Sequence, residues 1–422
     1  MTRTKFAIWW IARFILKAAR CRPNWRHMMW INNARLVLPD GVLEHGSLRI
    51  EDGIIAEIIE GSAPESGISI PGLTVIPGII DLHGDMLERD IEPRPGAQFP
   101  VELALFELDK RLAAAGITTA FAAVSFAWRQ HDLRSQGKAL EIINVIHQRR
   151  EECLVDMRVH ARFEMTNPDT ALVLQPLLDE GKVQLVSIMD HTPGQGQYTN
   201  IEKYVDFMTR WLGFDPEKIG VDILKQIEGA IVQKAAKPRD WNIVRDVIKT
   251  ALRHAIPVAS HDDDTLEKVH DEHELGVTIS EFPVTHAAAE AARQRGMHVI
   301  MGAPNAYRGA STSDNLSARD AIKLGLVDIL ATDYFPAAML HAAFLLAEQG
   351  IMPLHEAIKL ISQNPADAMG LDDRGRLEVG RSADLVLIET NGAHPRVRGT
   401  LRHGMPIYRD SAVFWQPQPA RG

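Results

Sequence analysis

The middle of the chain alternates short apolar runs with segments whose apolar residues recur at helical spacing. An apolar run of about four to eight residues between turn residues predicts a buried strand, and apolar positions three and four apart predict a helix. Alternation of the two is typical of parallel strands joined by crossover helices. Eight strands are the number that closes a barrel, so we predict an α/β protein with a (β/α)8 TIM-type barrel. The predicted strands are residues 75–82, 117–124, 157–165, 183–190, 256–261, 277–282, 298–302 and 327–333.

A different pattern flanks this block at both ends. Residues 30–76 and 375–412 alternate apolar and polar positions over short runs, separated by Asp-Gly, Glu-Gly and similar turns. This period of two predicts half-buried strands. We therefore predict that the two flanks together form a small β-sandwich beside a barrel that spans residues 77–374.

Residues 1–29 are basic and aromatic and belong to neither pattern. The apolar run at 6–16 is interrupted by Arg13 and is too short to cross a bilayer. No small-residue cleavage site follows it, as a signal peptide would need. An interfacial helix and a stretch upstream of a true initiator at Met28 or Met29 both fit these residues. We expect an N-terminal extension that is either not native or disordered, and we assign it no function.

Charge and cysteine content narrow the range of functions. The chain has 46 Lys and Arg against 55 Asp and Glu, a net charge of -9, which provides no basic surface for nucleic acid. Cys21 and Cys153 are the only cysteines, too few for a disulfide framework or a thiolate metal cage. We therefore expect a cytoplasmic protein with no membrane partner. The sequence leaves open whether the chain forms a homo-oligomer.

Metal-capable side chains stand at the ends of five of the predicted strands. The catalytic groups of a barrel collect at the C-terminal ends of its strands. Each of these residues taken alone is more often an ordinary loop residue, whereas their joint occurrence favours a metal site. Imidazole and carboxylate ligands suit zinc, manganese or iron, and six of them suit two divalent ions. The candidate ligands are His83, Asp85, Glu164, His191, His261 and Asp333.

These ligand types predict hydrolysis. Water held by divalent cations loses a proton near neutral pH and becomes a nucleophile. A carboxylate such as Asp333 can orient this water and accept its proton, so Asp333 is the predicted catalytic residue.

Two segments are candidates for binding an anionic substrate. Arg94 lies between two prolines shortly after the first strand. The segment "GAPNAYRGASTSDNLSARD" follows the seventh strand and places glycines and hydroxyls ahead of a predicted helix, an arrangement that suits phosphate oxygens. An ordinary Gly/Ser loop explains this segment equally well. Its candidate substrate ligands are Asn305, Arg308, Ser311 and Ser313.

Several motifs resemble a known family. The flanks "VIPGIIDLHGD" and "GRSADLVLIE" resemble the amidohydrolase superfamily, and "MDHTPGQGQY", "ASHDDDT", "MGAPNAYRGASTSDN" and "ATDYFPAAML" are similar to the diphosphatases of the carbon-phosphorus lyase pathway. The resemblance covers about residues 30–410. It implies a binuclear metal hydrolase that removes diphosphate from α-D-ribose 1-methylphosphonate 5-triphosphate, a phosphorylated ribose phosphonate. It also implies that the six candidate ligands are metal or catalytic positions.

The chain departs from that family's pattern at a few positions. Gly84 and Met86 stand where the family pattern has Thr and Asn, and Thr312 and Asp314 stand where its phosphate-side loop has His and Gly. Two other functions therefore remain open. One is an amidohydrolase acting on a cyclic amide, an N-acyl compound or an aminated base, and the other is a non-catalytic scaffold subunit.

Overall fold

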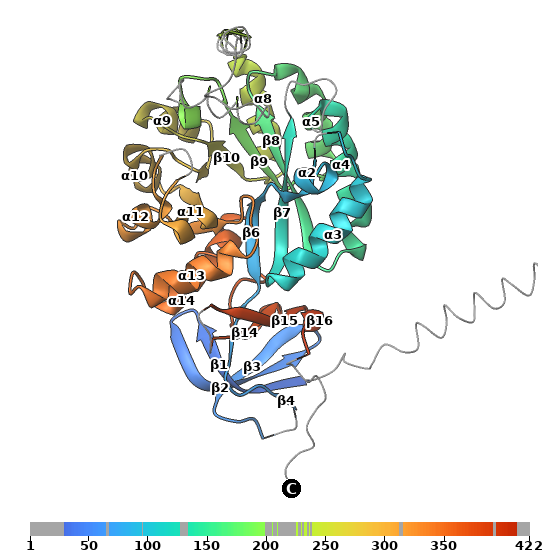
Figure 1. The fold of residues 1–422 in the computed structure, drawn as a ribbon, viewed down its shortest axis with the longest axis vertical. Coiled ribbons are helices and arrows are strands. Elements are labelled where there is room, and N and C mark those ends of the chain that lie inside the picture. Colours follow the sequence, from blue (N-terminus) through green and yellow to red (C-terminus); the bar gives the residue numbers. More distant parts are fainter. Residues whose placement is uncertain are drawn as a thin grey trace, which may run out of the picture.

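The computed structural model describes residues 29–411, apart from residues 65–66, 95, 127–133, 312–314 and 391–393 and most of 199–238. Figure 1 shows a barrel surrounded by helices and a separate β-rich module at one end of it. The predicted N-terminal extension lies outside the described residues except for its last residue, Met29, which already belongs to the first strand.

Eight parallel strands form the barrel, in the order β13-β12-β11-β10-β9-β8-β7-β6. The last strand meets the first through the backbone, because Asp333 donates its N–H to the carbonyl of His83 at 2.9 Å and Asp85 donates to the carbonyl of Asp333 at 2.7 Å. This ring of strands confirms the predicted fold class. The strands are β6 (Ile79–Gly84), β7 (Ile117–Phe126), β8 (Asp156–Glu164), β9 (Leu185–Met189), β10 (Val258–His261), β11 (Ile279–Glu281), β12 (His298–Gly302) and β13 (Ile329–Ala331).

The first predicted barrel strand, 75–82, is wrong as a single element. The structure divides it into β5 (Leu73–Pro77), which belongs to the other sheet, and β6 of the barrel. Gly78 lies at the break, and a Cβ there would be 2.2 Å from Oγ1 of Thr118. Such close approach of two segments requires glycine. The apolar run continues through the break because both strands are buried, so hydrophobicity alone does not reveal it.

Helices cover the outside of the barrel (Figure 1). Several begin with a side-chain cap; Ser317, for example, accepts a hydrogen bond from the N–H of Asp320 at 3.3 Å, as its place before the apolar run predicts. The described α-helices are α2 (Met86–Ile91), α3 (Val101–Ala114), α4 (Gln136–Arg149), α5 (Ala171–Asp179), α8 (Trp241–Arg253), α9 (Leu266–Glu274), α10 (His286–Gln294), α11 (Ala303–Arg308), α12 (Ala318–Lys323), α13 (Ala338–Glu348), α14 (Leu354–Lys359) and α15 (Gln363–Ala368). Short 3-10 turns are η1 (Arg150–Glu152), η2 (Pro168–Thr170) and η3 (Gly196–Tyr198).

The second sheet joins the two ends of the chain. Strand β5 pairs antiparallel with β14, so that N-terminal and C-terminal strands share one sheet in the order β16-β15-β14-β5-β1-β2-β3, with β4 beside β1. The exact domain boundaries stay a prediction. The remaining strands are β1 (Met29–Leu38), β2 (Gly41–Glu51), β3 (Ile54–Glu60), β4 (Gly67–Ser69), β14 (Leu385–Glu389), β15 (Arg396–Arg402) and β16 (Met405–Arg409).

A compact apolar cluster fills the barrel beneath the strand ends. It contains Phe121, Leu185, Ile279 and Ile300 from four different strands, all fully buried. This cluster gives the polar side chains above it a rigid floor, because protein interiors pack as densely as crystals. None of the described helices has the length and apolar character needed to cross a membrane.

Candidate metal centre

Strand β8 places three polar side chains on one face. His160, Arg162 and Glu164 are two residues apart, so their side chains point the same way along the strand. Ala161 and Phe163, which alternate with them, belong to the apolar core between the strands and the surrounding helices. The three polar side chains therefore face the inside of the barrel.

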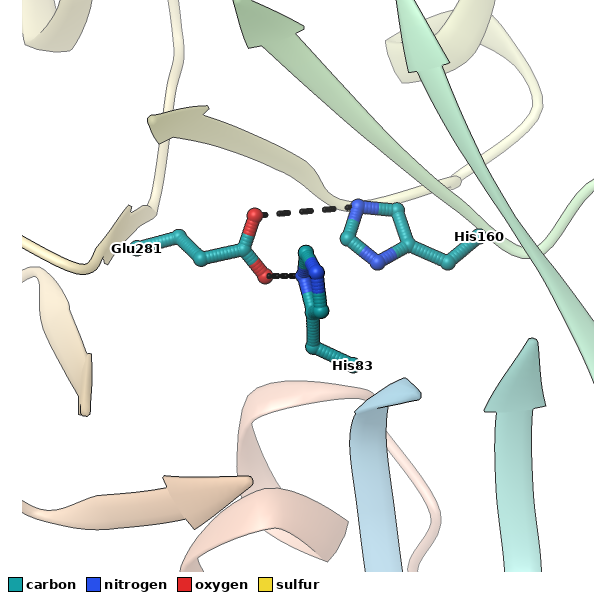
Figure 2. A group of neighbouring side chains, drawn as sticks. All are labelled: His83, His160 and Glu281. Carbon is teal, nitrogen blue, oxygen red and sulfur yellow. Dashed lines mark hydrogen bonds and ion pairs between the residues drawn. The ribbon is translucent and has the colours of Figure 1, made fainter. Parts of the chain in front are cut away.

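Glu281, the last residue of β11, reaches toward two histidines (Figure 2). Its Oε1 accepts a hydrogen bond from Nδ1 of His83 at 2.8 Å, and its Oε2 lies 3.9 Å from Nε2 of His160. Burial would lower the pKa of His83, but the carboxylates of Glu281 and Asp85 raise it to about 10. Burial would likewise raise the pKa of Glu281, but His83 and His160 lower it to about 2. The two side chains are thus fully buried and joined by a hydrogen bond.

His160 is held as a neutral ring. Burial, reinforced by the positive charges of His83 and Arg162, lowers the pKa of His160 to about 3. Its Nδ1–H donates to the carbonyl of Leu82 at 3.1 Å, and its Nε2 accepts from the hydroxyl of Ser187 at 3.0 Å. Both ring nitrogens are therefore fixed in direction.

A second group lies at the ends of β9 and β10. Oδ2 of Asp262 is 3.0 Å from Nδ1 of His261 and 3.8 Å from Nε2 of His191. Burial would raise the pKa of Asp262, but His261 and then His191 lower it. Asp262 has a φ of 53°, in the left-handed region that residues other than glycine seldom adopt. Such backbone conformations cluster at functional sites.

The two groups form one site. The ring centroids of His83 and His261 are 5.8 Å apart, and those of His191 and His261 are 5.4 Å apart. Oε2 of Glu281, in the first group, is 3.8 Å from Nε2 of His261, in the second. Four histidines and two carboxylates, located on or directly after five different strands, therefore share a small volume.

The donor atoms of this site fit divalent cations. Glu281 Oε2, Asp262 Oδ2 and His261 Nδ1 are buried and, within the described part of the chain, have no hydrogen-bond partner. The 3.0 Å contact between Asp262 and His261 is an ion-pair contact without hydrogen-bond geometry. Buried polar atoms are normally satisfied, and carboxylate and imidazole atoms are the ligands that zinc, manganese and iron accept. Two sets of side chains have the spacing to hold a metal ion, namely His83, His160 and Glu281, and His191, His261 and Asp262.

Asp85 and Asp333 lie beside this site. Asp85 Oδ1 is 3.4 Å from Nε2 of His83 and 3.0 Å from a terminal guanidinium nitrogen of Arg162. Burial would raise the pKa of Asp85, but Arg162 and His83 hold it well below its usual range. The pKa of Asp333 is instead raised to about 6, first by burial and then by the negative charge of Asp85. The two carboxylates thus have distinct environments.

Glu164 contacts His191 directly. Its Oε2 accepts a hydrogen bond from Nδ1 of His191 at 2.8 Å, and its Oε1 accepts from Oγ1 of Thr166 at 2.9 Å. The structure therefore brings all six predicted ligands to one end of the barrel. Their role as metal ligands stays a prediction.

The two predicted substrate arginines lie at the surface. Arg94 is exposed, and its backbone forms an isolated antiparallel β-bridge with Ala97. Arg308 is exposed at the end of α11. In water their charges are strongly screened, so they are weaker anion ligands than a buried arginine.

Asn305, on α11, contacts the end of the loop that leads to α12. The Asn305 side chain donates to the carbonyl of Leu316 at 3.0 Å and accepts from the N–H of Ala318 at 3.0 Å. These two bonds hold α11 to the start of α12. Ser311 is partly buried, and Ser313 lies outside the described residues.

The sequence analysis did not predict four residues of this site, namely His160, Arg162, Asp262 and Glu281. His160 and Arg162 share the two-residue spacing with Glu164, which was the available signal for them. Glu281 is the penultimate residue of the predicted strand 277–282, and Asp262 is the next residue after His261. The sequence therefore indicated that Glu281 and Asp262 lie near strand ends, but it did not indicate which side chains they contact.

A (β/α)8 barrel with buried histidines and carboxylates at one end of its strands is typical of metal-dependent hydrolases. Residues 110–408 match the amidohydrolase family, and the chain belongs to that family. It is 38% identical over 391 residues to the α-D-ribose 1-methylphosphonate 5-triphosphate diphosphatase of Escherichia coli (strain K12), a match that covers 90% of this chain and 100% of the relative. This confirms the predicted family.

Other relatives are more distant. The chain is 24% identical over 400 residues to the dihydroorotase of Wolbachia sp. subsp. Drosophila simulans (strain wRi), covering 85% of this chain and 86% of the relative. The crystal structure of N-acetyl-D-glucosamine-6-phosphate deacetylase from Mycobacterium smegmatis is similar with a TM-score of 0.61 at 16% identity, covering 90% of this chain and 100% of that one. A structure of a Xaa-Pro dipeptidase gives 0.63 at 14% identity, covering 91% and 100%. At such identities these structures establish the fold alone.

Proposed function

We propose that this chain is a metal-dependent diphosphatase that hydrolyses α-D-ribose 1-methylphosphonate 5-triphosphate to the 5-phosphate and diphosphate in phosphonate catabolism. We propose further that it works in the cytoplasm with two divalent ions of zinc, manganese or iron. The observation that carries the proposal is the 38% identity over the full length of the Escherichia coli diphosphatase.

The side chains at the strand ends have distinct roles in this proposal. We assign His83, His191 and His261 as metal ligands together with Asp85, Asp262 and Glu281. Divalent cations supply positive charge that stabilises a phosphoryl group under attack. Glu281 orients His83 through its bond to Nδ1, because a carboxylate that accepts from a ligating imidazole fixes the direction of its other nitrogen.

Asp333 is assigned as the general base. Its pKa of about 6 leaves its carboxylate ionised at neutral pH but basic enough to accept a proton from water. The backbone bonds of Asp333 with His83 and with Asp85 hold this carboxylate beside the candidate ligands.

The direct test is to incubate the purified chain and Mn²⁺ or Zn²⁺ with the ribose triphosphate and to record the phosphorus spectrum. Diphosphate and the 5-phosphate are expected in equal amounts. Release of single phosphates, or no change in the spectrum while the metal-loaded protein is folded, would contradict the proposal.

A second candidate is hydrolysis of a cyclic amide. The similarity to dihydroorotases, which covers 85% of this chain, supports this candidate. Turnover of dihydroorotate without diphosphate release from the triphosphate would favour this candidate.

A further inference from the structure

Arg162 lies inside the candidate metal centre. One terminal nitrogen of its guanidinium is 3.0 Å from Oδ1 of Asp85, and the other is 3.3 Å from Nε2 of His261. Its Nε donates to Sδ of Met189 at 3.2 Å, and its side chain is 8% exposed. Burial would lower the pKa of Arg162, but Asp85 and then Glu281 keep it above its ordinary value. The site therefore contains a permanent positive charge.

Arg162 and a divalent ion compete for the same atom. Nε2 of His261 lies 3.8 Å from Oε2 of Glu281, so it is the atom with which His261 faces the candidate ligands of the first group. Nε2 has one lone pair, which accepts either an N–H of Arg162 or a metal ion but not both. When a cation binds Nε2 of His261, the N–H of Arg162 that contacts this atom must therefore find another acceptor.

We propose that Arg162 is a phosphate-binding residue of the active site, released from His261 when a divalent ion binds and then donating to an oxygen of the substrate's phosphoryl group. The inference rests on the proposed diphosphatase function and deepens it. An arginine N–H without a partner in a buried site is unfavourable, and a phosphate oxygen satisfies it through a charge-assisted hydrogen bond.

The position of Arg162 favours this role over a purely structural one. A structural arginine in this protein has stable carboxylate partners, as Arg374 does with Asp156 at 2.9 Å and Asp373 at 2.9 Å. Arg162 instead contacts two candidate metal ligands, and those contacts weaken as cations take over the ligand atoms. By contrast, Arg94 and Arg308 lie exposed in water.

The proposal predicts that metal and phosphate binding are coupled, and coupling is reciprocal between the two ligands. Mn²⁺ is titrated calorimetrically into the full chain, first in chloride and then in inorganic phosphate at equal ionic strength. Phosphate is expected to tighten Mn²⁺ binding by about tenfold or more in the wild type. Absence of any effect in the wild type overturns the proposal, whatever the variants do.

Arg162→Gln removes the competing charge. This variant is expected to bind Mn²⁺ in chloride at least as tightly as the wild type, while the phosphate effect falls to about twofold or less. An undiminished phosphate effect, or Mn²⁺ binding in chloride more than about tenfold weaker than in the wild type, overturns the proposal. Arg158→Gln is the matched control, because Arg158 lies on the same strand but pairs with Asp156; it is expected to keep the full phosphate effect.

Diphosphate release is measured on the same preparations, which separates the two proposals. Release of diphosphate without phosphate-coupled Mn²⁺ binding refutes the role of Arg162 and leaves the diphosphatase function standing. If phosphate tightens Mn²⁺ binding but no diphosphate is released, the diphosphatase function is refuted, and Arg162 remains a phosphate-binding residue.

Discussion

The carboxylate of Glu281 lies 2.8 Å from Nδ1 of His83, although 198 positions separate the two residues in the chain. Neither side chain is exposed, and the bond turns the other ring nitrogen, Nε2, toward Asp85 at 3.4 Å. A hydrogen bond from a ligating imidazole to a carboxylate fixes the ring and makes it a stronger ligand. His83, on the first strand of the barrel, is therefore oriented by a residue at the end of the sixth strand.

Glu281→Gln should weaken metal binding. The amide keeps the size of the side chain but loses the negative charge that faces His83 and His160, so we expect metal affinity to fall by about 10- to 100-fold. Competition with a chelator, followed by metal analysis, measures the change. Glu267→Gln, on the exposed start of α9, is the control and should bind metal normally. Unchanged affinity in Glu281→Gln would remove Glu281 from the site.

Gly84 and Met86 should behave as a coupled pair. A Cβ at Gly84 would lie 2.9 Å from Cε of Met86 and 3.0 Å from Oδ2 of Asp81, so Met86 fills the space that a larger residue at 84 would need. We expect Gly84→Thr alone to destabilise by about 1–3 kcal/mol through overpacking.

Met86→Ala should relieve that overpacking. Alone it should destabilise by about 2–5 kcal/mol, because it leaves a cavity. Combined with Gly84→Thr, the total loss should be smaller than the sum of the two by about 1 kcal/mol. Urea midpoints of the four proteins measure the coupling, and strict additivity would contradict it.

Asp156 should stabilise the fold in a pH-dependent way. It is buried and contacts Arg158 at 3.0 Å and Arg374 at 2.9 Å. Burial would raise the pKa of Asp156, but Arg158 and Arg374 outweigh burial and lower it. A lowered pKa in the folded state means that the stabilisation is complete above the unfolded pKa of about 3.9 and is lost as the pH falls through the folded value.

Asp156→Asn is therefore expected to destabilise by about 3 kcal/mol at pH 7, because it leaves two arginines without their shared partner. The difference from the wild type should stay constant down to about pH 5 and shrink below about pH 4. Urea midpoints across this range test it. Asp246→Asn, exposed on α8, provides the baseline, and a penalty that grows on acidification would show that the sign is wrong.

The barrel could be predicted because its strands are apolar runs with turn residues between them. The six candidate ligands were visible for the same reason, since each follows or ends such a run, as His261 ends β10. The break at Gly78 was hidden because strands of two different sheets adjoin there, both of them buried.

The pairing of side chains across the barrel could not be predicted from one sequence. Arg162 looks like a charged residue on a strand until the structure places it between Asp85 and His261. The sequence also did not show which arginines are exposed to solvent. Arg94 and Arg308 have the right charge to bind a phosphate, but both are exposed. Contacts between residues distant in the chain, and the direction of long side chains in loops, depend on the assembled fold.

Asp333→Asn should separate metal binding from catalysis. The amide cannot accept a proton, and its size is unchanged, so we expect metal content to stay near that of the wild type while kcat for diphosphate release falls by about 10²- to 10⁴-fold. Because the pKa of Asp333 is raised to about 6, the wild-type rate should also fall as the pH drops below that value, when the base becomes protonated. The variant should lack this acidic limb in whatever activity it retains. Asp328→Asn, which removes a carboxylate that pairs with Arg293 and His298 outside the site, is the control for a general effect on the barrel. Full turnover in Asp333→Asn with metal bound would exclude Asp333 as the base and leave the carboxylates of Asp85, Asp262 and Glu281 to supply one.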